Sequence, residues 1–267
     1  MPFEQLLALA VIQGLTEFLP ISSSGHLNLL HLLTAWEDEG AYMDVAIHVG
    51  SLLAVMLYFW RDMLGFLAAL ARLVRGEVTA EGRLLLLVIA ASVPIFAAGY
   101  VVMKSGLMPS LRTLPVIAWA NMVFAVVLYA ADRLGRNDRR CEELTLGDAI
   151  LVGLSQVLSI VPGASRAGVT MSMARFLGVE RTEAARFSMF LSIPTILGLG
   201  AATAYELRST GDLALQQDAV VAAGLSFVAA FASIAFMMAL LRRWSMTPFV
   251  VYRVVLGAVL LGYVYLA

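Results

Sequence analysis

The chain has 267 residues, of which 61% are hydrophobic and only 14% are charged, with a formal net charge of −1. A soluble domain is nearer half apolar and a quarter charged, so this composition excludes an ordinary soluble fold and predicts an all-α protein that crosses a membrane several times. The net charge gives no indication of a nucleic-acid partner, and we expect none.

The predicted elements begin with an apolar region, 3–36, that is interrupted in its middle by Pro20 and a polar string. Its start, MPFEQLLALAVIQG, lacks a basic segment and carries Glu4, so we expect no cleavable signal peptide. Full spans are expected at 41–60, 84–103 and 114–132. A second interrupted apolar region, 146–177, follows, and the last spans are expected at 184–205, 218–240 and 247–266.

The two interrupted regions are each too long for one helix and too short for two full spans of about 20 residues. We therefore predict two re-entrant helical hairpins, because irregular backbone at membrane depth is tolerated only where protein or a wet cavity satisfies it. A small polar string marks the break in each: ISSSGH at 21–26 and PGASR at 162–166.

The basic residues indicate the orientation in the membrane. If both hairpins return to their own side, thirteen arginines share one face and only three basic residues share the other, which puts the first group in the cytoplasm and both termini outside. The thirteen are Arg61, Arg72, Arg75, Arg83, Arg133, Arg136, Arg139, Arg140, Arg175, Arg181, Arg186, Arg242 and Arg243, against Lys104, Arg112 and Arg208. Arg166 and Arg253 are left inside the membrane.

The chain also carries a weak internal repeat. GLTE at 14–17 aligns with GLSQ at 153–156, and a proline and a small polar string follow in each case. Three spans come after each hairpin, and three is odd, so the halves 1–140 and 141–267 are predicted to run in opposite senses. In such an inverted repeat the broken helices meet near the midplane with substrate between them.

The two breaks predict an anion site. A second half-helix begins within 22–25, so Ser23, Ser24 and Gly25 are expected to offer unpaired backbone N–H groups, and helix N-termini of this kind bind anions. Ser22, in the same turn, is also a candidate for binding the substrate. The second break offers Gly163, Ser165 and Arg166 from the opposite side, which together suit a phosphate. The alternative is that the serines only cap a helix.

Glu17 is a candidate because a carboxylate in apolar sequence is costly. Gln13 lies one turn earlier on the same helix face, and the pair of oxygens could hold Mg²⁺ or Ca²⁺. The alternative for Glu17 is pairing with a neighbouring polar group.

Ser23 and His26 are three residues apart, so His26 could take a proton from the serine hydroxyl or from water. Arg166 lies between VPGAS and AGVTMSMA, where a bidentate phosphate contact would explain it. An ion pair with Glu17 is the alternative and is compatible with the same site. Thr170, one turn on, could donate to the same oxygens.

The other polar residues within apolar sequence are weaker candidates. Asp44 and His48 share a helix face and either line the outer mouth or lie at interfacial depth. Asn121 is expected to bond between helices, and Arg253 to reach the interface or find a partner. His31 is expected to be structural. Cys141 is the only cysteine, which excludes an internal disulfide, and no cysteine lies near His26 and His31, so zinc is not expected.

These motifs resemble the undecaprenyl-diphosphate phosphatase family of bacterial membranes, the bacitracin-resistance type. The family carries a Glu/Gln-x-x-x-Glu motif, here Gln13 to Glu17, that runs into FLPISSSGH, and a Pro-Gly-x-Ser-Arg-Ser-x-x-Thr motif, here PGASRAGVT at 162–170. The resemblance covers the whole chain. It implies hydrolysis of undecaprenyl diphosphate, release of phosphate, recycling of the carrier lipid for peptidoglycan synthesis, and a divalent cation.

The resemblance also implies residue roles. Glu17 would act as cation ligand or base, and Ser23 or His26 would make or assist the attack. Arg166, with Ser165 and Thr170, would hold the diphosphate. The sequence departs from the motifs twice: Gln13 takes the amide option, which puts a purely carboxylate metal site in doubt, and Ala167 replaces the second serine.

A transporter or flippase of a lipid phosphate is the alternative function, because midplane anion sites between inverted repeats are a transporter design. For either function we expect a multi-pass protein of the bacterial inner membrane, with a polyprenyl diphosphate lipid as ligand. Its site would open to the outer face, and a homodimer is possible.

Overall fold

The computed structural model describes residues 1–34, 36, 40–207 and 213–266, and every regular element in this part of the chain is helical. The α-helices are α1 Phe3–Thr16, α2 Ser23–Leu33, α3 Gly40–Tyr58, α4 Trp60–Leu73, α5 Ala80–Ser105, α6 Met108–Leu111, α7 Leu114–Leu134, α8 Leu146–Val157, α9 Arg166–Phe176, α10 Arg181–Leu207, α11 Leu213–Leu241 and α12 Thr247–Leu266. Short 3₁₀ turns follow at η1 Cys141–Glu143 and η2 Leu158–Ile160.

Within the described residues, four helical segments are long and apolar enough to cross a membrane: Ala80–Ser105, Leu114–Leu134, Gln216–Leu241 and Thr247–Leu266. Together with the bent pair α3–α4 they confirm the predicted class, an all-α polytopic membrane protein. The expected span at 184–205 lies within the continuous helix α10.

The expected span at 41–60 is where the structure departs from the sequence prediction. α3 ends at Tyr58, and the chain turns by 86° into α4, which the sequence analysis did not predict. Only Phe66 and Ala69 of α4 are buried, so one narrow apolar stripe packs inward and the rest of the helix is partly or fully exposed. Such a helix suits the end of a span rather than its middle.

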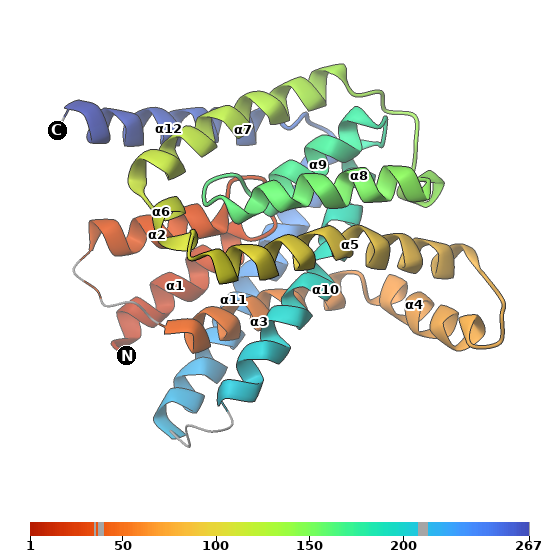
Figure 1. Ribbon diagram of the computed structural model, residues 1–267, viewed down its shortest axis with the longest axis horizontal. Coiled ribbons are helices and arrows are strands. Elements are labelled where there is room, and N and C mark those ends of the chain that lie inside the picture. Colours follow the sequence, from red (N-terminus) through yellow and green to blue (C-terminus); the bar gives the residue numbers. More distant parts are fainter. Residues whose placement is uncertain (35, 37–39, 208–212, 267) are drawn as a thin grey trace.

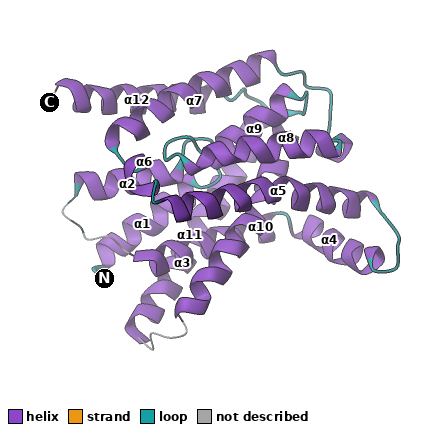
Figure 2. Cartoon of the chain, in the orientation of Figure 1, coloured by secondary structure: helices purple, strands orange, loops and turns teal. Residues whose placement is uncertain are grey.

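Both predicted hairpins are helix–break–helix units. α1 and α2 flank a break at 17–22, and α8 and α9 flank η2 and a turn at 161–165. Figure 1 shows α1 and α2 on the side where both termini lie, with α8 extending from the opposite side. Figure 2 shows the loops of the two breaks close together in the middle of the helices. An inverted repeat requires this arrangement, but the repeat and its division at residue 140 stay predictions.

Matched glycines explain how the first helix of each hairpin packs. A Cβ on Gly14 of α1 would lie 2.6 Å from the Ser226 backbone oxygen in α11, and one on Gly153 of α8 would clash with the Ala91 backbone oxygen in α5. These are the two glycines that the sequence alignment pairs. Each lets two helix backbones approach more closely than any side chain would allow.

The apolar core lies where these helices meet, and it includes Phe18, Phe187 and Phe190 beside the breaks. Many large apolar side chains on the outer faces of α5, α7 and α12 are exposed, such as Val93, Val126 and Val259. Exposed apolar surface on this scale is expected of a protein surrounded by lipid.

Candidate active site at the two helix breaks

Ser22 and Ser165 build the same turn at the two breaks. Each is the N-cap of the following helix, with φ of 75° at Ser22 and 72° at Ser165. The Ser22 hydroxyl accepts from the Gly25 amide at 3.2 Å, and the Ser165 hydroxyl accepts from the Gly168 amide at 3.1 Å. A positive φ is strained for a serine, and such strain is concentrated at functional sites.

The two turns touch each other. The Gly163 amide of the second break donates to the Ser22 hydroxyl of the first at 3.1 Å. A Cβ on Gly25 would be in van der Waals contact with the Gly163 Cα atom, 3.5 Å away, so the two turns are close neighbours. Ser22 therefore both caps α2 and joins the breaks.

Glu17 is where the reactive side chains converge. Its Oε2 accepts from the Ser23 hydroxyl at 2.6 Å and from the Gln13 amide nitrogen at 2.9 Å. Its Oε1 accepts from Arg166 Nη2 at 2.8 Å. The carboxylate is buried, and these charge-assisted bonds offset the loss of its water.

Ser23 and Arg166 occupy equivalent places, because each directly follows the cap serine of its helix. Arg166 Nη1 also donates to the Ser188 carbonyl oxygen at 3.1 Å, and its guanidinium lies 5.8 Å from the centre of the Phe18 ring. The Thr170 hydroxyl donates to the Arg166 carbonyl oxygen at 2.8 Å and lies 2.7 Å from the Ser188 hydroxyl. Thr170 therefore supports the site from behind.

His26 faces away from Ser23. Its Nδ1 is 2.7 Å from the Ser22 carbonyl oxygen, which can only accept, so Nδ1 carries the proton. Its Nε2 then accepts from the Tyr252 hydroxyl at 2.6 Å. Among the described residues, the Ser23 hydroxyl bonds to Glu17 and not to His26, so the base nearest to this serine is the carboxylate.

The expectation that the amides of Ser23, Ser24 and Gly25 would all be unpaired is corrected by the structure. The Gly25 and Gly163 amides are both bound by the Ser22 hydroxyl. The amides of Ser23 and Ser24 open α2, where a helix supplies no acceptor. Ser24 is exposed, so this first turn of α2 is the part that an anion can reach.

Two residues join the site that the sequence analysis had placed elsewhere. His48 Nε2 lies 3.8 Å from Glu17 Oε2, while its Nδ1 lies 2.6 Å from the Asp44 carbonyl oxygen. Arg253 was expected at the interface or in a pair, yet it is fully buried against the backbones of both breaks. An arginine inside an apolar span was the signal for this role, but only tertiary contacts reveal its partners.

A divalent cation fits the residues beside Glu17. Gln13 Oε1 is buried and has no hydrogen-bond partner in the described part of the chain, so an oxygen ligand is available next to the carboxylate. Carboxylate and amide oxygens are the ligands that Mg²⁺ and Ca²⁺ prefer.

A second cluster, Cys141, Glu142 and Glu183, has ligand atoms within 4.8 Å of one another and could hold a metal by its spacing. Arg186 Nη1 already contacts it, 2.6 Å from Glu142 Oε1 and 3.1 Å from Glu183 Oε2. Burial raises the pKa of the Cys141 thiol, and the neighbouring Glu183 adds to the effect, so the sulfur stays protonated. The Arg186 guanidinium thus already neutralises the two carboxylates that a metal ion would otherwise bind.

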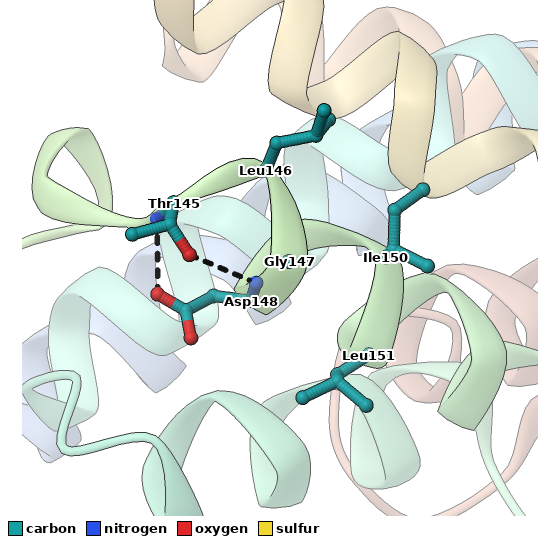
Figure 3. Close-up of a pocket in the computed structure, with 6 residues that line it drawn as sticks. All are labelled: Thr145, Leu146, Gly147, Asp148, Ile150 and Leu151. Carbon is teal, nitrogen blue, oxygen red and sulfur yellow. Dashed lines mark hydrogen bonds between the residues drawn. The ribbon is translucent and has the colours of Figure 1, made fainter.

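A hollow of about 630 Å³ lies at the start of α8, away from the breaks, lined by Thr145, Leu146, Gly147, Asp148, Ile150 and Leu151. Figure 3 shows that its polar groups serve the helix: the Thr145 hydroxyl accepts from the Asp148 amide, and the Asp148 carboxylate accepts from the Thr145 amide. This capping box fixes where α8 begins.

Comparison with known proteins agrees with the resemblance drawn from the motifs. The sequence model of the family described as "Bacitracin resistance protein BacA" matches residues 6–259. A protein of Roseobacter denitrificans is 48% identical over 97% of this chain and 98% of its own, and one of Ruegeria sp. is 47% identical over 99% and 100%. A protein of Jannaschia sp. is 45% identical over 97% and 98%, and all three are named undecaprenyl-diphosphatase. The chain belongs to the BacA bacitracin-resistance family.

Proposed function

We propose that this chain is an enzyme that hydrolyses undecaprenyl diphosphate to undecaprenyl phosphate and phosphate, and so recycles the carrier lipid for cell-wall synthesis. The names of its relatives support this activity over nearly the whole chain. The observation that carries the assignment is the meeting of Ser23, Arg166 and Glu17, a hydroxyl, a guanidinium and a carboxylate from two broken helices.

The lipid tail of the substrate suits the apolar faces of the spans, and its diphosphate suits the polar breaks. The polyprenyl tail stays in the bilayer or against the exposed apolar faces of the spans, and the diphosphate enters between the breaks. Arg166 offers a planar fork for phosphate oxygens, and the first amides of α2 add donors aimed at an anion. Ser24, Gly25, Gly163 and Ser165 shape this cradle, with Ser22 joining its two halves.

The chemistry begins with the Ser23 hydroxyl. Its oxygen attacks the terminal phosphorus while Glu17 Oε2, 2.6 Å away, takes the proton. The bond from that phosphorus to the bridging oxygen breaks, and undecaprenyl phosphate leaves. Arg166 neutralises charge on the transferring phosphoryl group, which is most of what such a reaction requires. Water then releases phosphate from the serine. His26 holds the first turn of α2 through the Ser22 carbonyl rather than acting on Ser23.

Gln13 Oε1 and Glu17 would hold a divalent cation, Mg²⁺ or Ca²⁺. When bound, such an ion neutralises charge on phosphate oxygens. A transporter gains no support from the relatives, which are named for a phosphatase. We further propose that the protein lies in the bacterial inner membrane with both termini and the site on the outer face, as the distribution of arginines favours. A homodimer is compatible with this arrangement.

Phosphate release from undecaprenyl diphosphate by purified protein in detergent tests the proposal. We expect steady release that falls on addition of a chelator and returns with excess Mg²⁺ or Ca²⁺. Detergent removes the second compartment, so a transporter would release nothing. Release that is unaffected by the chelator would remove the cation from the proposal while leaving the hydrolase in place.

A further inference from the structure

Arg253 binds the backbones of both breaks at once. Its Nη1 donates to the Pro20 carbonyl oxygen at 3.0 Å and to the Ala164 carbonyl oxygen at 3.1 Å. Its Nη2 donates to the carbonyl oxygens of Gly163 at 2.7 Å and Ala164 at 3.1 Å. Its Nε reaches the Asn121 carbonyl oxygen at 3.4 Å, so the guanidinium also contacts α7.

This contact set has two unusual features. Arg253 is 0% exposed, and within the described residues it forms no ion pair, so its charge is met by carbonyl dipoles alone. Burying a guanidinium in this way is costly, and a large cost inside a membrane span indicates a role. Each of its three nitrogens is bonded to protein, so Arg253 has no free donor for a substrate.

The carbonyl groups that Arg253 binds are close in sequence to the proposed reacting residues. Pro20 lies three residues before Ser23, and Ala164 lies two residues before Arg166. One rigid guanidinium therefore fixes where α2 begins relative to α9. Tyr252, the preceding residue, bonds to His26 from the same helix, so α12 supports the first break twice.

We propose that Arg253 is a positioning residue for the hydrolysis, which holds Ser23 and Arg166 at the separation that the phosphoryl group requires by tying the two breaks together. The inference rests on the proposed function. A displacement of about 1 Å at a reacting group is enough to cost about 10²-fold in rate. We call the bonds from Arg253 to the carbonyls of Pro20, Gly163 and Ala164 the clamp, and weakening it therefore lowers kcat. Substrate binding through the lipid tail and Arg166 is retained, so KM changes less.

Arg175 provides a matched control. It is equally buried, and its Nη atoms bond to the carbonyl oxygens of Arg136, Gly135 and Val179 beyond the far end of α9. A guanidinium that only stabilises the fold should behave like this one. We expect Arg175→Lys to lower the melting temperature while kcat per folded molecule stays within about twofold.

The experiment compares Arg253→Lys with Arg175→Lys in purified full-length protein, by steady-state kinetics and hydrogen–deuterium exchange. We expect Arg253→Lys to lower kcat by about 30- to 100-fold with less than about a threefold change in KM, because one ammonium cannot span four carbonyls. Amide exchange should rise about tenfold in both 17–26 and 160–168, and Arg175→Lys should leave these segments unchanged.

Gly168→Ala tests the same clamp if Arg253 variants fail to fold. A Cβ at Gly168 would lie 2.9 Å from Arg253 Nη1, so it displaces the guanidinium without removing its charge, and it would also lie 3.2 Å from the Ser165 Cβ atom in the cap of α9. Its control is Gly224→Ala in α11, where a Cβ meets nothing within 4 Å. We expect Gly168→Ala to lower kcat and to raise exchange in both breaks, and Gly224→Ala to do neither.

Unchanged kcat in folded Arg253→Lys, or exchange that rises in only one break, would overturn the proposal. Equal losses of kcat in Arg253→Lys and Arg175→Lys would reduce Arg253 to a stabilising residue. The exchange measurement needs no substrate, so it tests the clamp even if the wild-type protein released no phosphate, a result that would overturn only the proposed function and the positioning role that depends on it.

Discussion

The break after α1 and the break after α8 share a backbone turn but differ in chemistry. In both, a serine with positive φ caps the second helix through the amide three residues on. The residue after that serine is Ser23 in the first break and Arg166 in the second. Glu17 in the first hairpin faces both, and the aligned residue in the second hairpin is Gln156, whose side chain bonds to Thr195 instead.

The same backbone turn carries a different kind of side chain at each break. The first break brings the hydroxyl and the carboxylate, which can exchange a proton. The second brings a fixed positive charge, which can stabilise a phosphoryl group. The shared turn provides the position, and under the proposed function the residue after each cap supplies a different chemical group. Substitutions in the two breaks should therefore have different effects from each other, and larger effects than substitutions elsewhere.

Replacing Ser23 with alanine should lower phosphate release more than any other substitution considered for the two breaks. If Ser23 attacks phosphorus, Ser23→Ala should lower phosphate release by roughly 10³-fold or more, because the nucleophile itself is removed. Ser110→Ala, at an exposed serine of α6 outside both breaks, is the control and should keep the wild-type rate. A substantial rate in Ser23→Ala would exclude the covalent route and favour attack by water.

Glu17→Gln should remove the proton acceptor while nearly keeping the shape of the side chain. The amide keeps nearly the same size but accepts no proton, so kcat should fall by about 10²- to 10³-fold. The variant also weakens the pairing with Arg166, and a folded protein should be verified by its melting temperature. Activity within a few fold of wild type would mean that Ser23 loses its proton elsewhere.

Arg166→Lys should test the charge of the second break. A point charge cannot donate to Glu17, the Ser188 carbonyl and a phosphate in the manner of a planar fork, so kcat/KM should fall by about 10²-fold. Arg186→Lys, at an ion-pair cluster away from the breaks, is the matched substitution. Near-normal kcat/KM in Arg166→Lys would remove Arg166 from the site.

The smallest effect is expected outside both breaks, at Glu142. Burial alone would raise the pKa of this carboxyl, but the hydrogen bond from Arg186 and the neighbouring charges bring it below its usual value. The pair therefore adds stability above the unfolded pKa of about 4.3, and this stability is lost as the pH falls through the lower folded pKa.

The side chain of Glu142 is 35% exposed, so screening keeps the effect of Glu142→Gln below about 1 kcal/mol. We expect a melting temperature at pH 7 that is lower by no more than about 3 °C, with the difference closing below pH 4. Phosphate release at pH 7 should not change. A difference in melting temperature that grows at acid pH would contradict the assigned direction.

Much of the fold could be predicted from local sequence. Apolar length gave the spans, and Pro20 and the PGASR string marked both breaks. α4 was missed because its apolar stripe is narrow and it continues an apolar span without an obvious break before Trp60. His26 was assigned to Ser23 from spacing, yet a rotation of one side chain within a turn directs it to Tyr252, 226 residues away.

Local sequence was sufficient to identify a helical membrane protein with two polar breaks, and to place Glu17, Ser23 and Arg166 in or directly beside them. Those features depend on apolar length and on residues near one another in the chain. The packing of the helices was needed to show that the Ser22 hydroxyl joins the breaks, that Glu17 rather than His26 faces Ser23, and that Arg253 binds both turns. These contacts join residues brought together by helix packing, and no local pattern records which distant donor will meet which acceptor.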